Sequence, residues 1–279
     1  MSLLESLILG LVQGLTEFLP VSSSGHLAVI QYLFGVSADN VLVFTVMLHF
    51  GTLIAIFIAY WKDIKELIIE LFATLKDIFT GKGLQMNKNE TRRMGVMIIV
   101  TSIPTGFFGI CFNDFFEGFY SSMIFIGAAL LITGCCLMYA EKKGGGDKDI
   151  NTMTVKDAFL IGLCQSVAIC PGISRSGSTL VGGLLCKFNR QHAVRYAFLI
   201  SIPPVLGAFL LEVPDAVKSV SSAADTSFGI LVAGMVVAAV SGYAAIRIMI
   251  KAVTDNKLNY FSYYTWAVGL ALIIYSVAA

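Results

Sequence analysis

A short pattern that occurs twice constrains the fold of this chain more than any other feature of its sequence. Residues 10–26 run from Gly-Leu-Val-Gln to Pro-Val-Ser-Ser-Ser-Gly-His, and residues 162–177 run from Gly-Leu-Cys-Gln to Pro-Gly-Ile-Ser-Arg-Ser-Gly. An offset of 152 residues superposes Gly10 on Gly162, Gln13 on Gln165, Ser22 on Ser174, Ser24 on Ser176 and Gly25 on Gly177. The chain is therefore predicted to be a tandem duplication.

The two copies differ in the polar residues that they carry. Glu17 and His26 occur only in the first copy, whereas Arg175 occurs only in the second. Because these groups complement one another, we expect one site built from both halves of the chain.

The composition indicates an integral membrane protein. Hydrophobic residues make up 57% of the chain and charged residues only 13%, which is too little polar surface for a soluble globule. The net charge of +1 lacks the excess of basic residues that is typical of nucleic-acid-binding proteins. A chain of this kind is expected to cross the membrane several times.

Each copy of the pattern is predicted to form a helical hairpin that enters the membrane and returns. The arms of the first hairpin, within 3–35, fall short of the roughly 20 apolar residues that a crossing needs, and Pro20 breaks the helix between them. The second hairpin is expected at 155–186. Irregular backbone at membrane depth is tolerated only where it is buried in protein or lines a wet cavity, so the tips are expected to lie at a functional site.

Six further apolar segments are predicted to cross the membrane. They lie at 41–60, 94–112, 119–140, 196–211, 228–246 and 258–279. The glycine-rich segment 141–151 is expected to be a flexible linker between a first repeat at 1–140 and a second repeat at 152–279. The predicted fold class is an all-α integral membrane protein of two repeats, each a re-entrant hairpin plus three transmembrane helices.

The number of crossings also predicts how the repeats are oriented. Three crossings per half is an odd number, so the second repeat should be inverted relative to the first. If the first hairpin enters from outside, 17 of the 19 Lys and Arg residues fall in four cytoplasmic segments: 61–93, 141–157, 187–195 and 247–257. This distribution follows the positive-inside rule, and inverted repeats with broken helices are typical of transporters.

Residues 61–80 have a pattern unlike that of the spans. Apolar residues from Ile64 to Ile78 recur at helical spacing, with charges such as Glu70 and Asp77 off that stripe. We expect an amphipathic helix on the membrane surface whose charges form a solvated face. The aromatic residues expected in interfacial belts are Tyr60, Trp61, Tyr263, Tyr264 and Trp266.

Arg175 lies within the second hairpin, where no cytoplasmic loop accommodates its charge. A charge in the membrane costs about 2.5 to 3.5 kcal/mol on insertion scales and so indicates a functional site with a partner. An ion pair with Glu17 is one interpretation. We favour binding of an anion, because the loop leads into a helix N-terminus, where free N–H groups attract phosphate, and a guanidinium matches phosphate oxygens. The neighbouring loop residues are Gly172, Ser174, Ser176 and Gly177.

The first copy supplies groups suited to phosphoryl transfer. Gln13 and Glu17 stand four residues apart on one helical face. After the turn at Pro20 come Ser22, Ser23, Ser24 and His26. Such a set offers a nucleophile or base and a carboxylate that can share Mg²⁺ with substrate phosphates. Ser22 alone would be explained as a helix N-cap and His26 alone as a packing residue, but their combination in matched hairpins indicates a catalytic site.

At these residues the chain resembles the undecaprenyl-pyrophosphate phosphatase family associated with bacitracin resistance. The segment QGLTEFLPVSSSGH at 13–26 is similar to that family's first signature, and PGISRSG at 171–177 is similar to its second. Length, span number and hairpin placement extend the resemblance over essentially the whole chain. It implies a multi-pass enzyme of the bacterial cell membrane that hydrolyses a C55 polyprenyl pyrophosphate to the monophosphate and phosphate, which recycles the carrier lipid for cell-wall synthesis. It also makes a homodimer plausible.

The resemblance further implies roles for individual residues. Glu17 corresponds to the essential acidic residue, His26 to the histidine, Ser23 to a serine proposed as nucleophile, and Ser174 with Arg175 to the phosphate-binding core. Attack on the terminal phosphorus is assigned to His26, Ser23 or water, with Mg²⁺ or Ca²⁺ held by Glu17. Many members have Glu where this chain has Gln13, which removes a possible second metal carboxylate. The expected substrate-binding residues are Gln13, Ser22, Ser24, Gly172, Ser174, Ser176 and Gly177.

A transporter or channel for a phosphate-bearing solute or lipid is the alternative function. Inverted repeats with re-entrant hairpins are the architecture of that class. Glu17 and His26 beside the serines favour the enzyme, because binding an anion needs only helix dipoles and an arginine.

Overall fold

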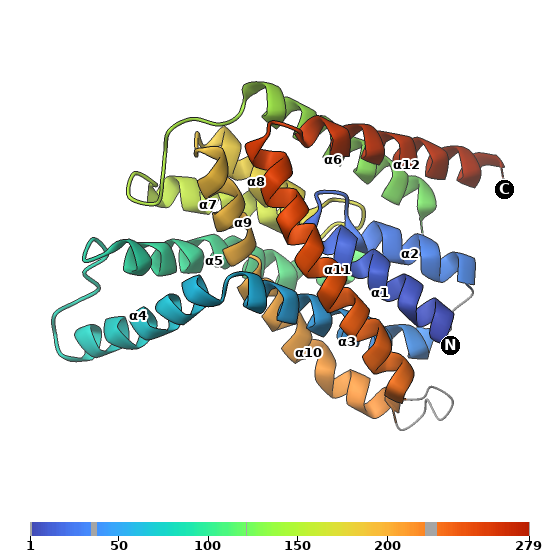
Figure 1. Cartoon of the computed structure of the whole chain (residues 1–279), viewed down its shortest axis with the longest axis horizontal. Helices are drawn as coiled ribbons and strands as arrows, with labels where there is room; N and C mark the ends of the chain where they lie inside the picture. The colour runs from blue at the N-terminus through green and yellow to red at the C-terminus, as the bar shows by residue number, and fades with distance from the viewer. Residues whose placement is uncertain (1, 35–37, 121, 221–227, 279) are drawn as a thin grey trace.

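The chain folds into a bundle of helices (Figure 1). A computed structural model describes residues 2–34, 38–120, 122–220 and 228–278. The helices of the first half are α1 (Leu3–Phe18), α2 (Ser23–Phe34), α3 (Ala38–Ala59), α4 (Trp61–Phe79), α5 (Glu90–Glu117) and α6 (Met123–Lys143). Those of the second half are α7 (Val155–Val167), α8 (Arg175–Leu185), α9 (Arg190–Leu199), α10 (Ile202–Val220), α11 (Phe228–Thr254) and α12 (Leu258–Ala278).

The described residues contain five helical segments that are long and apolar enough to cross a membrane. They are Glu90–Phe112, Met123–Lys143, Arg190–Leu211, Phe228–Thr254 and Leu258–Ala278. Phe44–Ala59 of α3 meets α4 at a bend of 87°, and this pair together passes the same test. The structure therefore confirms a helical, multi-pass membrane protein with five or six candidate spans.

Two pairs of short helices form hairpins, α1 with α2 and α7 with α8. The first arms have 16 and 13 residues, so they are about 24 and 20 Å long, shorter than the roughly 30 Å hydrocarbon core of a bilayer. The second arms, with 12 and 11 residues, are shorter still. These four helices are the segments that carry the duplicated pattern.

The first arm of each hairpin packs on a long helix of the other half. Helix α1 lies along α11, where a Cβ on Gly10 would clash with the carbonyl of Gly234. Helix α7 lies along α5, where a Cβ on Gly162 would clash with the carbonyl of Thr101. Gly10 and Gly162 occupy the same position in the two copies of the pattern, and both glycines permit the same kind of close helix contact.

The four basic segments of the sequence contact one another at one end of the molecule. Arg195 pairs with Asp63, which joins 187–195 to 61–93. Arg190 pairs with Glu141 at 2.9 Å and donates from Nη1 to the carbonyl of Val253 at 3.4 Å. These contacts fasten α4, α6, α9 and α11 together.

The segment expected to be a flexible linker is held against α8. The Gly145 N–H donates to the carbonyl of Leu184 at 2.7 Å, and the Lys148 N–H donates to the carbonyl of Lys187 at 3.0 Å. A parallel β-bridge joins Lys148 to Phe188. The glycine-rich backbone thus follows the end of α8 closely enough for its polar groups to pair, and the flexibility of this linker stays a prediction.

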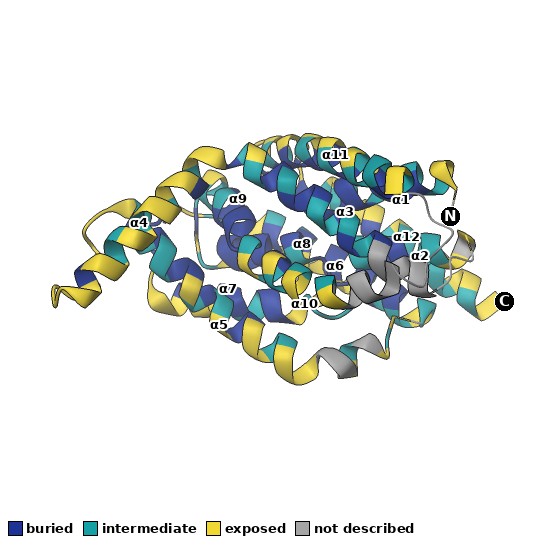
Figure 2. Ribbon diagram, turned by 90° about the horizontal axis from the view of Figure 1, so that it is seen from below, coloured by how far each residue is buried: buried dark blue, intermediate teal, exposed yellow. Residues whose placement is uncertain are grey.

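Helix α4 carries the predicted apolar stripe, but one of its charged side chains, Asp77, is buried and another, Glu70, is partly buried rather than solvated. Asp77 is 7% exposed and accepts a hydrogen bond from Lys88 Nζ at 2.9 Å. It also pairs with the fully buried Arg92 at the start of α5, whose Nε donates to Glu70 at 2.6 Å. A buried guanidinium needs such partners, so both carboxylates turn inward. Figure 2 shows exposed residues along much of the remaining surface of α4. The apolar ones are Ile68, Ile69, Leu71, Phe72, Leu75, Ile78 and Phe79.

The aromatic residues expected at the membrane interface fall into two groups. Trp61 and Tyr263 are exposed, as predicted. Tyr60 instead belongs to the core, with its ring centroid 5.8 Å from that of Phe198. Tyr264 is exposed as well, and its ring stacks on a residue of the first hairpin.

Candidate active site

The tips of the two hairpins lie against each other. The hydroxyl of Ser176, in the second tip, donates to the carbonyl of Leu19, in the first, at 3.0 Å. Gly25 faces Gly172, and a Cβ added to Gly25 would lie 3.4 Å from the Cα of Gly172. The structure thus brings the two copies of the pattern into contact, as their complementary polar residues predicted.

Glu17 is the point at which the two halves meet. Its side chain is buried, and its Oε1 pairs with the guanidinium of Arg175 from α8. Its Oε2 accepts hydrogen bonds from Ser23 Oγ at 2.6 Å and from Gln13 Nε2 at 3.1 Å. One carboxylate therefore receives donors from α1, α2 and α8, and the ion-pair interpretation of Arg175 describes the contact that the structure shows.

The first tip is shaped so that Ser23 reaches Glu17. Gln13 and Glu17 lie four residues apart on the same face of α1, and Ser23 begins α2 directly after the turn. Ser22 holds that turn with a φ of 70°, a left-handed conformation that costs energy for any residue except glycine. Its Oγ accepts the Gly25 N–H at 3.3 Å, so Ser22 acts as a cap of α2.

The second tip is shaped so that Arg175 begins α8. Ser174 is the N-cap, and its Oγ accepts the Gly177 N–H at 3.1 Å. Thr133 of α6 binds the backbone of this loop. Its Oγ1 donates to the carbonyl of Gly172 and accepts the Ser174 N–H, both at 3.3 Å. Gly172 has a φ of 91° and leaves no room for a side chain. No motif in the sequence pointed to Thr133, which lies within an otherwise apolar span.

The same hydrogen bonds recur in both tips. Ser22 and Ser24 share a bond of 3.3 Å between their hydroxyls, and so do Ser174 and Ser176. These four hydroxyls support the loops, and their direct contact with substrate stays a prediction.

His26 does not contact Glu17 or the side chains bound to it; its partners are Ser22 and Tyr264. Its Nδ1 lies 2.8 Å from the carbonyl oxygen of Ser22, and its Nε2 lies 2.9 Å from the hydroxyl of Tyr264 on α12. The His26 and Tyr264 rings stack, with centroids 5.6 Å apart and planes 9° from parallel. Gln13, Glu17, Ser23 and Arg175 are thus brought together, whereas His26 is held against the second half by a tyrosine that its sequence pattern did not identify.

The residues around Glu17 fit a hard cation. Gln13 is fully buried, and its Oε1 has no hydrogen-bond partner within the described structure. A carboxylate and an amide oxygen are ligands that Mg²⁺ and Ca²⁺ accept, and phosphate oxygens of a substrate are natural further ligands. Within the described ranges no three His, Cys, Asp or Glu side chains gather as a metal-binding group, so the protein offers only a partial ligand set.

A small cavity lies against Glu17, between α3 and the start of α10. Its lining residues are Glu17, Phe18, Thr52, Leu53, Ile56, Ser201, Ile202 and Val205. Most of these side chains are apolar, and electrostatic interactions are stronger beside apolar walls than in water. The surroundings therefore strengthen the attraction between Glu17 and Arg175.

The arrangement is suited to transfer of a phosphoryl group. A hydroxyl that donates to a carboxylate is a nucleophile beside its base. A guanidinium at the start of a helix is a donor group for phosphate oxygens. The two features meet at Glu17.

Comparison with known proteins agrees with this geometry. The sequence profile of the family "Bacitracin resistance protein BacA" matches residues 6–271. A protein of Alkaliphilus metalliredigens named undecaprenyl-diphosphatase is 48% identical over 277 residues, which cover 99% of this chain and 100% of that protein. Proteins of the same name from Methanosphaera stadtmanae and Halothermothrix orenii are 39% identical over 280 residues and 40% identical over 274 residues, and the matches cover 98% or more of each chain. With the signature residues assembled between its hairpins and its whole length matched, the chain belongs to the bacitracin resistance protein BacA family.

Proposed function

We propose that this protein is an undecaprenyl-diphosphatase, which hydrolyses undecaprenyl pyrophosphate to undecaprenyl phosphate and inorganic phosphate. The observation that carries the proposal is the contact of Ser23 and Arg175 with one buried carboxylate, Glu17. Full-length similarity to proteins of that name supports the same activity.

Arg175 binds the pyrophosphate in this proposal. Its guanidinium has five N–H donors, and one carboxylate oxygen engages only part of them. Its side chain is 26% exposed, so the remaining donors are accessible to phosphate oxygens. Charge-assisted bonds from a planar fork fix both the position and the orientation of the phosphate.

Ser23 is better placed than His26 to attack the terminal phosphorus. Its hydroxyl already donates to Glu17, which can take the proton as Oγ bonds to phosphorus and the bond to the bridging oxygen breaks. Undecaprenyl phosphate leaves, and water then hydrolyses the phosphoserine to release phosphate. His26, three residues further along α2, is the second candidate for attack or proton transfer, with Nε2 as its reactive nitrogen.

Glu17 and Gln13 would hold Mg²⁺ or Ca²⁺ together with phosphate oxygens of the substrate. A bound cation neutralises charge on the pyrophosphate and supplements Arg175. The unpartnered Oε1 of Gln13 supports this assignment.

Two inverted repeats, 1–140 and 152–279, complete the proposed architecture. Hairpins too short to cross a bilayer support their assignment as re-entrant. The matching hydrogen bonds of the two tips, and the packing of α1 on α11 and of α7 on α5, support the duplication.

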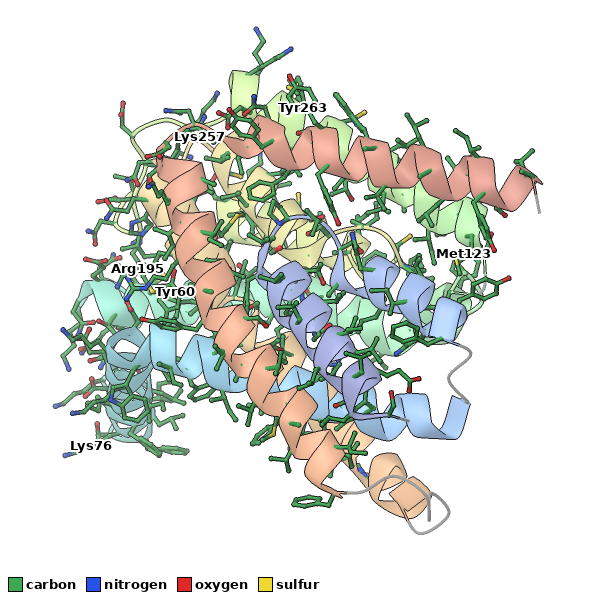
Figure 3. All side chains as sticks on the ribbon, turned by 45° about the vertical axis from the view of Figure 1, so that its right-hand side comes forward. Tyr60, Lys76, Met123, Arg195, Lys257 and Tyr263 are labelled. Atoms are coloured by element: carbon green, nitrogen blue, oxygen red, sulfur yellow. The ribbon has the colours of Figure 1, made fainter. Side chains whose placement is uncertain are left out.

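The proposed orientation places the basic end of the molecule in the cytoplasm. Figure 3 shows Lys76, Arg195 and Lys257 toward one end and Met123 toward the other. Both termini lie at the end away from the α4–α5 connection (Figure 1), so the N-terminus is assigned outside. Helix α4, which bends away from α3 and exposes an apolar face, is assigned to the cytoplasmic membrane surface. A homodimer stays a prediction.

Phosphate release by the purified protein in detergent tests the proposed activity. We expect one phosphate per undecaprenyl or farnesyl pyrophosphate consumed, and none from Glu17→Gln. If the wild-type protein released no phosphate but carried a phosphate-bearing solute into proteoliposomes, the transporter hypothesis would replace the enzyme hypothesis.

A further inference from the structure

The bonds of His26 define which of its ring nitrogens carries hydrogen. The carbonyl oxygen of Ser22 can only accept, so the Nδ1 that lies 2.8 Å from it carries the hydrogen. In the neutral ring Nε2 is then the acceptor, and the Tyr264 hydroxyl, 2.9 Å away, donates to it. The one lone pair that His26 has for attack or proton transfer is therefore capped by Tyr264.

The position of Tyr264 is set by the packing of α12 on α6. Gly127 and Gly269 approach so closely that a Cβ on either would meet the backbone oxygen of the other at 2.8 and 2.7 Å. Trp266 Nε1 donates to the carbonyl of Leu131 at 3.1 Å. These contacts fix the register of α12, and that register places the Tyr264 ring parallel to the His26 ring.

The Tyr264 ring lies at the surface of the helix bundle. Its residue is 45% exposed, whereas Ser22, which holds the other nitrogen of His26, is buried. A tyrosine at the surface can move aside when a phosphate oxygen approaches Nε2, which a residue locked in the core cannot do.

We propose that Tyr264 is a positioning residue of the active site: it stacks on His26 and donates to Nε2, and so caps that nitrogen until substrate displaces the hydroxyl. The proposal rests on the function proposed above, because it assumes that Nε2 of His26 takes part in the reaction. It adds a residue of the last helix to a site otherwise built from the two hairpins.

Tyr264→Phe separates the hydrogen bond from the stacking, because phenylalanine retains the ring. We expect KM to fall about three- to ten-fold, the effect of one hydrogen bond that substrate no longer has to displace, while kcat stays near the wild-type value. In a His26→Ala background the same substitution should have no further effect. An equal change in that background would overturn the proposal, and so would an unchanged KM in Tyr264→Phe.

A chemical probe gives a readout that does not depend on turnover. Diethylpyrocarbonate modifies an unprotonated imidazole nitrogen, so His26 in Tyr264→Phe should react several-fold faster than in the wild type. The chain has three histidines, and His49 and His192 serve as internal standards in peptide mass spectrometry. An unchanged His26 rate would overturn the cap. If the wild type releases no phosphate, the proposed function fails, yet the probe still decides whether Tyr264 caps His26.

Tyr263→Phe is the matched control. Tyr263 is the preceding residue on α12, is 54% exposed (labelled in Figure 3) and contacts Trp266 with its ring. We expect the wild-type KM and the wild-type His26 modification rate in this variant. If Tyr263→Phe changed both quantities as much as Tyr264→Phe does, loss of any hydroxyl on this helix would have the effect, and the assignment to Tyr264 would be overturned.

Discussion

Ser23 and Arg175 contact the two oxygens of the same carboxylate, that of Glu17, and each is the first residue of its helix. They are separated by 152 residues, the offset between the two copies of the pattern. In the proposed duplication, two equivalent positions therefore lie around one acidic group. Because one position holds a hydroxyl and the other a guanidinium, a pair of similar hairpins provides both groups that the proposed reaction needs.

Glu17→Gln should abolish phosphate release and also lower stability. An amide cannot take the proton of Ser23, and it leaves the guanidinium of Arg175 without a counter-charge. Removing one partner of a buried pair costs about 3 to 5 kcal/mol, and the partial exposure of Arg175 favours the lower end. Phosphate release and thermal unfolding in detergent measure the two effects. Glu66→Gln, an exposed residue of α4, is the matched control and should match the wild type. More than a tenth of wild-type turnover in Glu17→Gln would contradict the role of the carboxylate.

Arg175→Lys should be severely impaired although it keeps the charge. A lysine ammonium lacks the planar fork that binds two phosphate oxygens and orients the phosphorus toward Ser23. Lost orientation together with two charge-assisted bonds should cost about three decades in kcat/KM. Steady-state kinetics with farnesyl pyrophosphate measure this, and activity within five-fold of wild type would show that only the charge matters.

Much of the site was predictable, because the residues that build it lie in two short patterns. The helical spacing of Gln13 and Glu17 and the complementary residues of the two copies predicted that one site spans both halves. The sequence could not reveal that Glu17 and Arg175 pair directly, since this depends on how two tips 150 residues apart meet. Nor could it reveal the contacts of Thr133 and Tyr264, which lie outside the two patterns, and Tyr264 was expected only in an aromatic belt.

The fold was predictable to a similar degree and for a similar reason. Apolar length and proline breaks predicted the spans and the hairpins, because they act locally. The prediction failed where a tertiary contact overrides local character. Asp77 turns inward because the buried guanidinium of Arg92 needs a partner.

Gln13→Glu should strengthen the binding of Mg²⁺ or Ca²⁺. The substitution replaces an unpartnered amide oxygen with a second carboxylate beside Glu17, and hard cations bind more tightly as the ligand charge increases. Activity in the variant should therefore require a higher chelator concentration for half-inactivation than activity in the wild type. Isothermal titration with Ca²⁺ gives a second readout. An unchanged chelator midpoint and an unchanged Ca²⁺ affinity would remove Gln13 from the metal site.

The contact between α4 and α5 should weaken in acid. Hydrogen bonds from Lys88 and Arg92 hold the pKa of the Asp77 carboxyl below its ordinary value of about 3.9. Because the folded-state pKa is the lower one, the stabilisation is fully present above that ordinary value and is lost as pH falls through the folded-state pKa. Hydrogen exchange of residues 80–89 should thus accelerate at low pH. In Asp77→Asn, residues 80–89 should exchange faster than in the wild type at neutral pH, and their exchange should accelerate less on acidification. If acidification accelerated exchange equally in the variant and the wild type, another group would be responsible for the effect.

A double-mutant cycle tests whether Ser23 and Arg175 serve one chemical step. If the guanidinium orients the phosphorus that Ser23 attacks, either single substitution, Ser23→Ala or Arg175→Lys, already removes most of the catalysis that depends on the pair. The double mutant should then be little worse than the poorer single mutant, as is found for residues that act as a unit. Ser23→Ala combined with Asp77→Asn is the control, because Asp77 lies in the α4–α5 ion-pair cluster, and those two effects should multiply. Phosphate release at saturating substrate measures all the variants. Losses that multiply for Ser23 and Arg175 as they do for the control pair would mean that each hairpin acts independently, and the shared carboxylate of Glu17 would then be a structural contact rather than the centre of the site.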